Sequence, residues 1–183
     1  MSLTDRELWT LIHGMGFGAF YLLAFAGGLA GLYSLRPALL TAEGIRERVL
    51  RLRWGIILMA VLVWLTVLVG TYVVYPWYRA APPKTLDTTV QSEELRAYPR
   101  FWLLANEKTA PAHEFGMEWK EHVAWFAPIL ATVVAFIVLR YGKRLAEMPF
   151  LRKTLMITFM LAFAAAGVAG LMGALITKAA PIH

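Results

Sequence analysis

The sequence predicts an all-α integral membrane protein: an antiparallel four-helix bundle with an extended outer, periplasmic loop between its second and third helices. Of the 183 residues, 59% are hydrophobic and 16% are charged, whereas a soluble domain is about 45–50% apolar and about 25% charged. The apolar residues gather in four blocks, and each block reaches the roughly 20 helical residues that cross the hydrocarbon core of a bilayer. Strands of an outer-membrane barrel would instead alternate apolar and polar residues.

The predicted spans form a single transmembrane domain over residues 1–183. They cover about residues 8–35, 54–76, 118–139 and 151–177. The third span reaches the required length only with an amphipathic lead-in before its apolar part. The connections after the first and third spans are short, which favours an up-down bundle of neighbouring helices. The outer loop, residues 77–117, is longer, and its aromatic residues resemble an interfacial belt.

Basic residues are concentrated in the two short connections. Residues 36–53 contain five arginines and two glutamates, and residues 140–153 contain five basic residues and one glutamate. The positive-inside rule therefore places both connections in the cytoplasm, with the termini and the outer loop outside. In a bacterium this is a multi-pass protein of the inner (cytoplasmic) membrane with both termini in the periplasm. The net charge of +6 comes from residues that flank the spans, so it does not indicate nucleic-acid binding.

Several classes of chemistry are excluded by what the sequence lacks. Without cysteine there are no disulfides, no cysteine-ligated iron–sulfur cluster and no covalently attached c-type haem. The glycine-rich loops that bind nucleotides are missing, as is the nucleophile elbow of hydrolases. No charged residue lies deep in any predicted span, which argues against an ion channel or a proton pump.

The histidines are the candidates for a functional site. The sequence contains four of them, and all belong to the outer half of the predicted bundle: His13, His113, His122 and His183. An ionisable residue inside a span is costly and by default marks a function, and His13 lies about one turn inside the first span. Antiparallel neighbours would bring His13 and His122 to similar depth, where two neutral imidazoles can ligate the iron of one b-type haem.

Glycines accompany these histidines in the outer halves of the helices. A flat porphyrin needs helix faces with little side-chain bulk, and the candidates to flank it are Gly14, Gly16, Gly70, Gly167 and Gly170. Close helix–helix contact through small residues explains the same glycines without any cofactor. Both interpretations remain open from the sequence.

His113 is considered separately because it lies nine residues before His122 and so faces the opposite side of a helix. It is an alternative iron ligand, a proton acceptor for quinol, or a surface residue, and His183 is expected to be exposed. Tyr75 is a candidate quinol-binding residue, with Glu118, Glu121 or His113 as the proton acceptor. Glu114, Glu118 and His122 recur every four residues, which suits a metal site but also a solvated helix start.

Four antiparallel spans with His13 and His122 at matching depth resemble the membrane-anchoring b-type cytochrome subunits, which carry electrons between a quinone pool and a partner redox subunit. The resemblance covers about residues 8–177. It implies one haem b and partners among membrane or periplasmic subunits of a redox complex, with quinol as a further candidate. The alternatives are a non-catalytic structural or accessory subunit of a larger complex and a metal-dependent membrane enzyme. Small residues of the first span, Gly27, Gly28 and Gly31, would support contacts with a partner helix.

Overall fold

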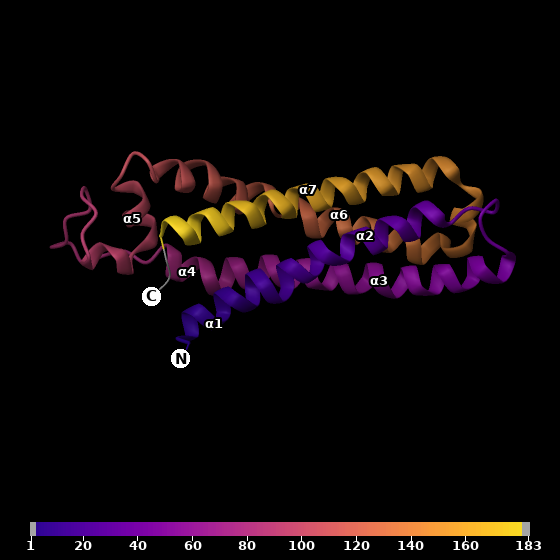
Figure 1. Ribbon diagram of the computed structural model, residues 1–183, viewed down its shortest axis with the longest axis horizontal. Coiled ribbons are helices and arrows are strands. Elements are labelled where there is room, and N and C mark those ends of the chain that lie inside the picture. Colours follow the sequence, from indigo (N-terminus) through magenta and orange to yellow (C-terminus); the bar gives the residue numbers. More distant parts are fainter. Residues whose placement is uncertain (1–2, 181–183) are drawn as a thin grey trace.

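The computed structural model describes residues 3–180, and every regular element in this range is a helix. Four of these helices are long and apolar enough to cross a membrane: Asp5–Ser34, Ala42–Tyr78, Ala112–Glu147 and Pro149–Ala179. The predicted all-helical fold is therefore confirmed, as is the presence of four helices with the length and composition to span a membrane (Figure 1).

Three of the four spans change helix type along their length. The first consists of α1 (Asp5–Leu11), the π-helical turn η1 (Ile12–Gly18) and α2 (Ala19–Ser34). The second consists of α3 (Ala42–Val69), the π-helical turn η2 (Gly70–Val74) and α4 (Tyr75–Tyr78). The third consists of the π-helical turns η4 (Ala112–Met117) and η5 (Trp119–Val123), then α6 (Phe126–Tyr141) and the 3₁₀ turn η6 (Gly142–Glu147).

The fourth span is the single helix α7 (Pro149–Ala179), and the long connection carries η3 (Glu94–Ala97) and α5 (Pro99–Leu104). The second span begins twelve residues before its predicted start at residue 54. Thr41 caps it by accepting a hydrogen bond from the Gly44 amide at 3.1 Å, and Arg51 pairs with Glu47 one turn away at 3.2 Å. Polar residues can continue a helix beyond the hydrocarbon core, so hydropathy alone located the apolar part and not the helix start.

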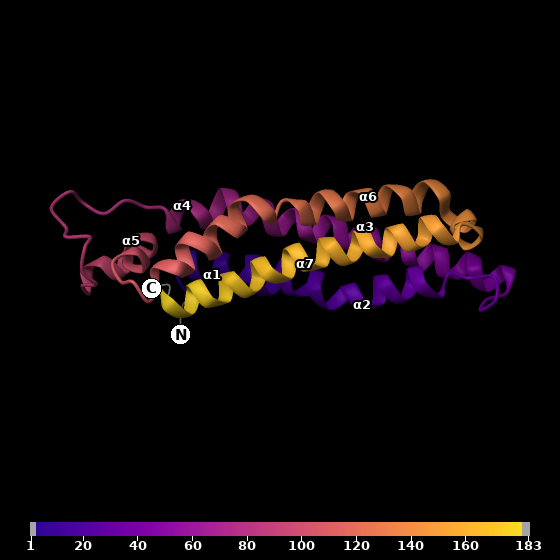
Figure 2. The ribbon, with the colours of Figure 1, turned by 90° about the horizontal axis from the view of Figure 1, so that it is seen from above.

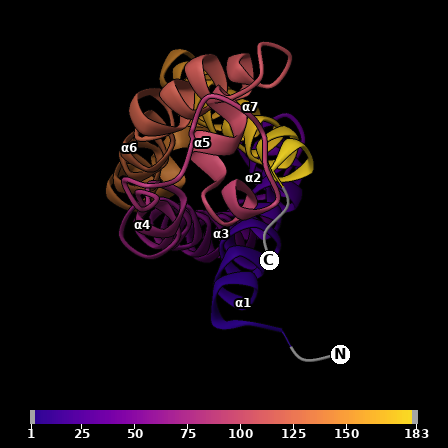
Figure 3. The same cartoon turned by 90° about the vertical axis from the view of Figure 1, so that its left-hand side faces the viewer.

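The long helices lie side by side along one axis. The two short connections lie at one end, here called the loop end, and the N- and C-terminal ends of the described chain lie at the other, here called the terminal end (Figures 1 and 2). Consecutive long helices therefore run in opposite directions. α2 contacts α3 and α7, and α6 contacts the same two helices, so the four surround a common core when seen along the axis (Figure 3).

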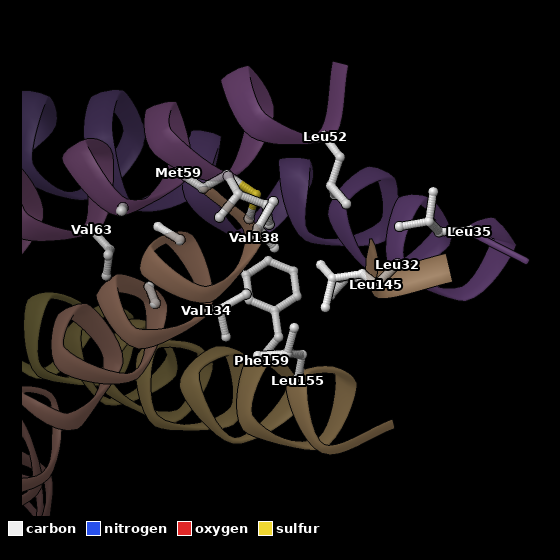
Figure 4. Packing of buried hydrophobic residues seen from close by; sticks show 14 of the residues in the cluster. Leu32, Leu35, Leu52, Met59, Val63, Val134, Val138, Leu145, Leu155 and Phe159 are labelled. Carbon is white, nitrogen blue, oxygen red and sulfur yellow. The ribbon is translucent and has the colours of Figure 1, made fainter. Parts of the chain in front are cut away.

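The main core fills the half of the bundle toward the loop end. Its centre is the fully buried ring of Phe159 on α7, which lies among Met59, Val134 and Leu32 from the other three long helices (Figure 4). Gly28 makes this possible, because a Cβ atom there would lie 2.9 Å from Cε1 of Phe159. A smaller cluster at the terminal end holds the long connection against the bundle: Tyr78, Leu103, Met117, Ile176 and Ala180.

Most of the apolar helix surface faces outward. In each span, at most 39% of the most apolar window is buried inside the chain. Exposed large side chains such as Leu23, Phe136 and Leu161 continue this surface. A surface of this size and composition suits contact with the acyl chains of a lipid bilayer.

Among residues 3–180 one charged side chain is classed as buried by its exposure, and it joins segments at the loop end. This residue is Arg152, only 8% exposed, in the first turn of α7. Its Nη1 atom donates to the carbonyl oxygens of Leu35 at 2.7 Å, Ala146 at 3.0 Å and Leu145 at 3.2 Å. These carbonyls end the first span and the connection before α7, where helix geometry leaves oxygens without partners. One guanidinium thus joins three segments.

Replacing Arg152 with Met should lower the thermal unfolding midpoint of the purified protein in mild detergent. The apolar chain keeps the packing volume but removes the donor to the Leu35 and Ala146 carbonyls, whereas Leu145 keeps the Met148 amide as a donor. Each buried unpaired group costs about 1–3 kcal/mol. Lys153→Met is the matched control, since Lys153 is the exposed neighbour. Equal midpoints for the two variants would contradict the structural role of Arg152.

Candidate functional site

The π-helical turns of the described chain all lie toward the terminal end of the bundle. Each adds a residue to a helical turn and redirects the side chains that follow, and such turns are frequent at functional sites. His13 lies in η1, His113 in η4 and His122 in η5. All three histidines that the structure describes therefore belong to irregular turns, whereas His183 lies outside the described residues. The hydropathy pattern of the sequence did not indicate where the π-helical turns lie.

His13 is held by the second span. Its Nδ1 atom lies 2.8 Å from the carbonyl oxygen of Thr66. A carbonyl oxygen can only accept, so Nδ1 carries the proton and donates. The ring also lies directly against Gly70, where an added Cβ would come within 2.6 Å of Cε1. Any residue with a Cβ atom at position 70 would overlap the His13 ring in this position.

The remaining ring nitrogen of His13 is available for chemistry. Among the described residues Nε2 makes no hydrogen bond, and in a neutral imidazole that is protonated on Nδ1 it carries the free lone pair. A ring fixed through Nδ1–H to a backbone carbonyl is the usual arrangement of a metal-ligating histidine. The contact of the His13 ring with Gly70 was not predicted from the sequence, which named Gly70 only as a candidate to flank a porphyrin.

Lys120 is a functional candidate that sequence reasoning missed. Its ammonium group lies against Gly173 on α7, 2.9 Å from where a Cβ would stand, and α7 also contacts η1, the turn that contains His13. In the described part of the chain it has neither a hydrogen-bond nor an ion-pair partner. A cation without a counter-ion inside a membrane bundle is a default sign of function. The sequence feature that could have indicated Lys120 is Gly173 on α7, because the missing side chain there leaves room for the ammonium group.

The His122 side chain points away from the bundle interior, unlike that of Lys120. Two residues apart on a helix, Lys120 and His122 point to nearly opposite sides. The His122 side chain is 70% exposed, and its Nδ1 atom lies 3.0 Å from the Glu118 carbonyl oxygen and 3.4 Å from the Glu118 carboxylate. None of the described contacts joins His122 to His13.

The other predicted porphyrin-facing glycines have different surroundings from Gly70. A Cβ at Gly167 or Gly170 would meet Leu22 of the first span at 4.0 or 3.7 Å, which is ordinary packing distance. Gly14 faces open space, and Gly16 has only Ile12 of its own helix nearby. Close packing through small residues therefore accounts for Gly167 and Gly170 as they stand.

A second group of polar side chains, here called the tyrosine cluster, lies where the second and third spans meet at the terminal end. The Tyr78 hydroxyl and His113 Nδ1 are 2.7 Å apart. Arg79 donates to the Tyr75 hydroxyl and lies 3.9 Å from the Glu121 carboxylate. The second Glu121 oxygen, Oε1, is buried without a described partner.

The tyrosine cluster distinguishes between the carboxylates that the sequence left open as proton acceptors near Tyr75. Glu118 lies beside the exposed His122, whereas Arg79 contacts both the Tyr75 hydroxyl and the Glu121 carboxylate. Within residues 3–180 no three histidine, aspartate or glutamate side chains form a group that could hold a metal ion. The stacking of Glu114, Glu118 and His122 therefore gives no metal centre there. No protein-family model, curated protein or solved structure matches the chain.

Gly70→Ala should displace the His13 ring and break its hydrogen bond to Thr66, because the new methyl group would overlap Cε1. We expect the unfolding free energy to fall by about 1–3 kcal/mol, the range for overpacking a tight site. In the His13→Ala background the same change should cost much less, since nothing remains to overlap.

A double-mutant cycle of thermal unfolding in detergent measures this coupling. Gly14→Ala is the matched control, because a Cβ at Gly14 has nothing within 4 Å. Additive effects of Gly70→Ala and His13→Ala would contradict the described contact.

Proposed function

We propose that this protein is a membrane electron-transfer subunit that binds one b-type haem near the terminal end of its bundle, with His13 as an axial ligand. The observation that carries the proposal is the His13 imidazole: Nδ1 is bonded to the Thr66 carbonyl, the ring lies on Gly70, and Nε2 has no described partner. A bound haem would supply one-electron chemistry between ferric and ferrous iron, which no side chain of this chain provides.

The described residues offer one imidazole that could hold a haem iron, and no described contact brings a second imidazole beside it. Our proposed second ligand is His122, whose Nδ1 also lies on a backbone carbonyl and leaves Nε2 without a described partner. Ligation by His122 requires η5 to rotate about its axis so that this side chain replaces Lys120 on the inner face. His113 is the alternative, and its Nδ1 is already bonded to Tyr78.

Two further features support a redox site in this region. Lys120 places an unpaired positive charge near His13, where it would offset an anionic group such as a haem propionate. The tyrosine cluster contains Glu121 and His113, two groups that can accept the protons a quinol releases as it gives up electrons. Quinol and a partner redox subunit are therefore the proposed electron donor and acceptor classes.

The proposed setting is a bacterial inner membrane with an antiparallel bundle. Ten basic residues flank the loop end, in the connections 36–53 and 140–153, which supports a cytoplasmic position for that end. The terminal end, with the proposed haem and both termini, would then face the periplasm. Electrons would be exchanged at that face, and further membrane or periplasmic subunits would complete the electron path.

The competing function is a non-catalytic accessory subunit of a larger membrane complex. It is favoured by the outward direction of His122, which leaves His13 without a second imidazole. In that case His13 serves to join the first and second spans through Thr66. The two functions differ in whether the purified protein carries a pigment.

Reporter fusions at Gly44 and Leu145 should give cytoplasmic activity, and a fusion at Thr89 should give periplasmic activity. The expected pattern follows from the concentration of arginine and lysine at the loop end. Paired reporters, one active on each side of the membrane, measure it at all three positions. The reverse pattern would place the proposed haem at the cytoplasmic face.

Purified protein expressed with haem available should show a b-type reduced-minus-oxidised difference spectrum. The signal should vanish in His13→Ala and His122→Ala and survive in His113→Ala, because removal of an axial ligand releases or alters a non-covalent haem. Lys120→Met is expected to keep the pigment and shift its reduction potential.

Thermal unfolding of each variant shows whether a lost signal merely reflects misfolding. A colourless but folded wild-type protein would favour the accessory subunit. Loss of the spectrum in His113→Ala alone would keep the haem and assign its second ligand to His113.

A further inference from the structure

A groove opens on the bundle surface between α2 and α3, in the half toward the loop end. Its volume is about 390 Å³. The residues that line it from the first span are Ala24, Gly27, Gly28 and Gly31, and those from the second span are Arg48, Arg51, Leu52, Gly55, Ile56, Leu58, Met59 and Leu62. On each helix these positions recur every three or four residues, so each set forms one face.

Two glycines create the open part of the groove. A Cβ atom at Gly27 or at Gly55 would meet nothing within 4 Å. Gly28 and Gly31 behave differently, because their positions are closed by Phe159 and Leu52 inside the bundle. The groove therefore is not a by-product of core packing, and the missing side chains of Gly27 and Gly55 leave space on the membrane-facing side.

The groove is apolar along its length and basic at one end. Arg48 has no described ion-pair partner, and Arg51 pairs with Glu47 at a solvent-exposed position, 3.2 Å apart. From Arg48 to Leu62 the second span advances fourteen residues, about 21 Å at 1.5 Å per residue. One leaflet contributes about 15 Å of hydrocarbon, so the groove matches one leaflet with its headgroup region.

We propose that this groove binds one anionic phospholipid, with an acyl chain along Gly27 and Gly55 and the phosphate at Arg48 and Arg51. The charge complementarity selects this occupant, since a phosphate satisfies guanidinium groups beside an apolar channel. A partner transmembrane helix, with a diameter of about 10 Å, would need the arginines to find carboxylates at its own end. The proposal is independent of the haem.

The test titrates the purified full chain with phosphatidylglycerol or with phosphatidylcholine of the same acyl chains and counts bound lipids by native mass spectrometry. Wild-type protein should retain one phosphatidylglycerol in preference to phosphatidylcholine. Gly27→Leu with Gly55→Leu should abolish this retention by filling the groove, and both changes point into open space, so the fold should persist. Glycerol phosphate without acyl chains should not compete, which separates a lipid from a free phosphate ester.

Arg48→Gln with Arg51→Gln should reduce the preference for phosphatidylglycerol by roughly fivefold per arginine, which corresponds to about 1 kcal/mol for each basic residue. Lys143→Gln with Arg144→Gln removes the same charge from exposed positions outside the groove, and Gly14→Leu adds a leucine side chain at an open position elsewhere. Both controls should bind as wild type.

Unchanged lipid retention in the glycine variants, or equal losses in the control variants, would overturn the proposal. Loss of a co-purifying subunit or of self-association in the glycine variants, with lipid retention intact, would also overturn it and assign the groove to a helix.

Discussion

The need to satisfy polar groups inside a lipid-surrounded bundle governs this structure. In hydrocarbon a backbone carbonyl has no water to bond, so polar groups must find partners within the protein. At the loop end Arg152 meets this need for three carbonyls at once. Toward the terminal end His13 bonds the Thr66 carbonyl. These two side chains join helices that apolar packing alone would hold less specifically.

The two halves of the bundle differ in the regularity of their helices and in their polar side chains. The half toward the loop end has regular α-helices around Phe159 and a closed apolar core (Figure 4). The half toward the terminal end contains the π-helical turns, all the described histidines, and the unpaired Lys120 and Glu121 oxygen. Irregular backbone lowers stability, and the concentration of the π-helical turns and the described histidines in one half is what supports a functional site there.

Lys120 and His122 show how a single turn decides the chemistry of the site. In the described conformation the ammonium is directed inward toward Gly173 and the imidazole is directed outward beside Glu118. Rotating η5 would exchange them, and with them a positive charge for a neutral ligand. The haem proposal and the accessory-subunit alternative differ mainly in the direction of this turn, since His13 is held in the same way in both.

The sequence alone determined the all-helical class and the four spans, because a bilayer selects for long apolar blocks and these are visible as composition. It also indicated His13 as a candidate, since an ionisable residue inside an apolar helix is costly. Only the tertiary structure decided that Lys120 packs against Gly173, that Arg79 contacts both Tyr75 and Glu121, and that α3 begins at Ala42. The physical reason is rotation: a π-helical turn changes which side chains share a face, and hydropathy, which averages over whole turns, does not record it.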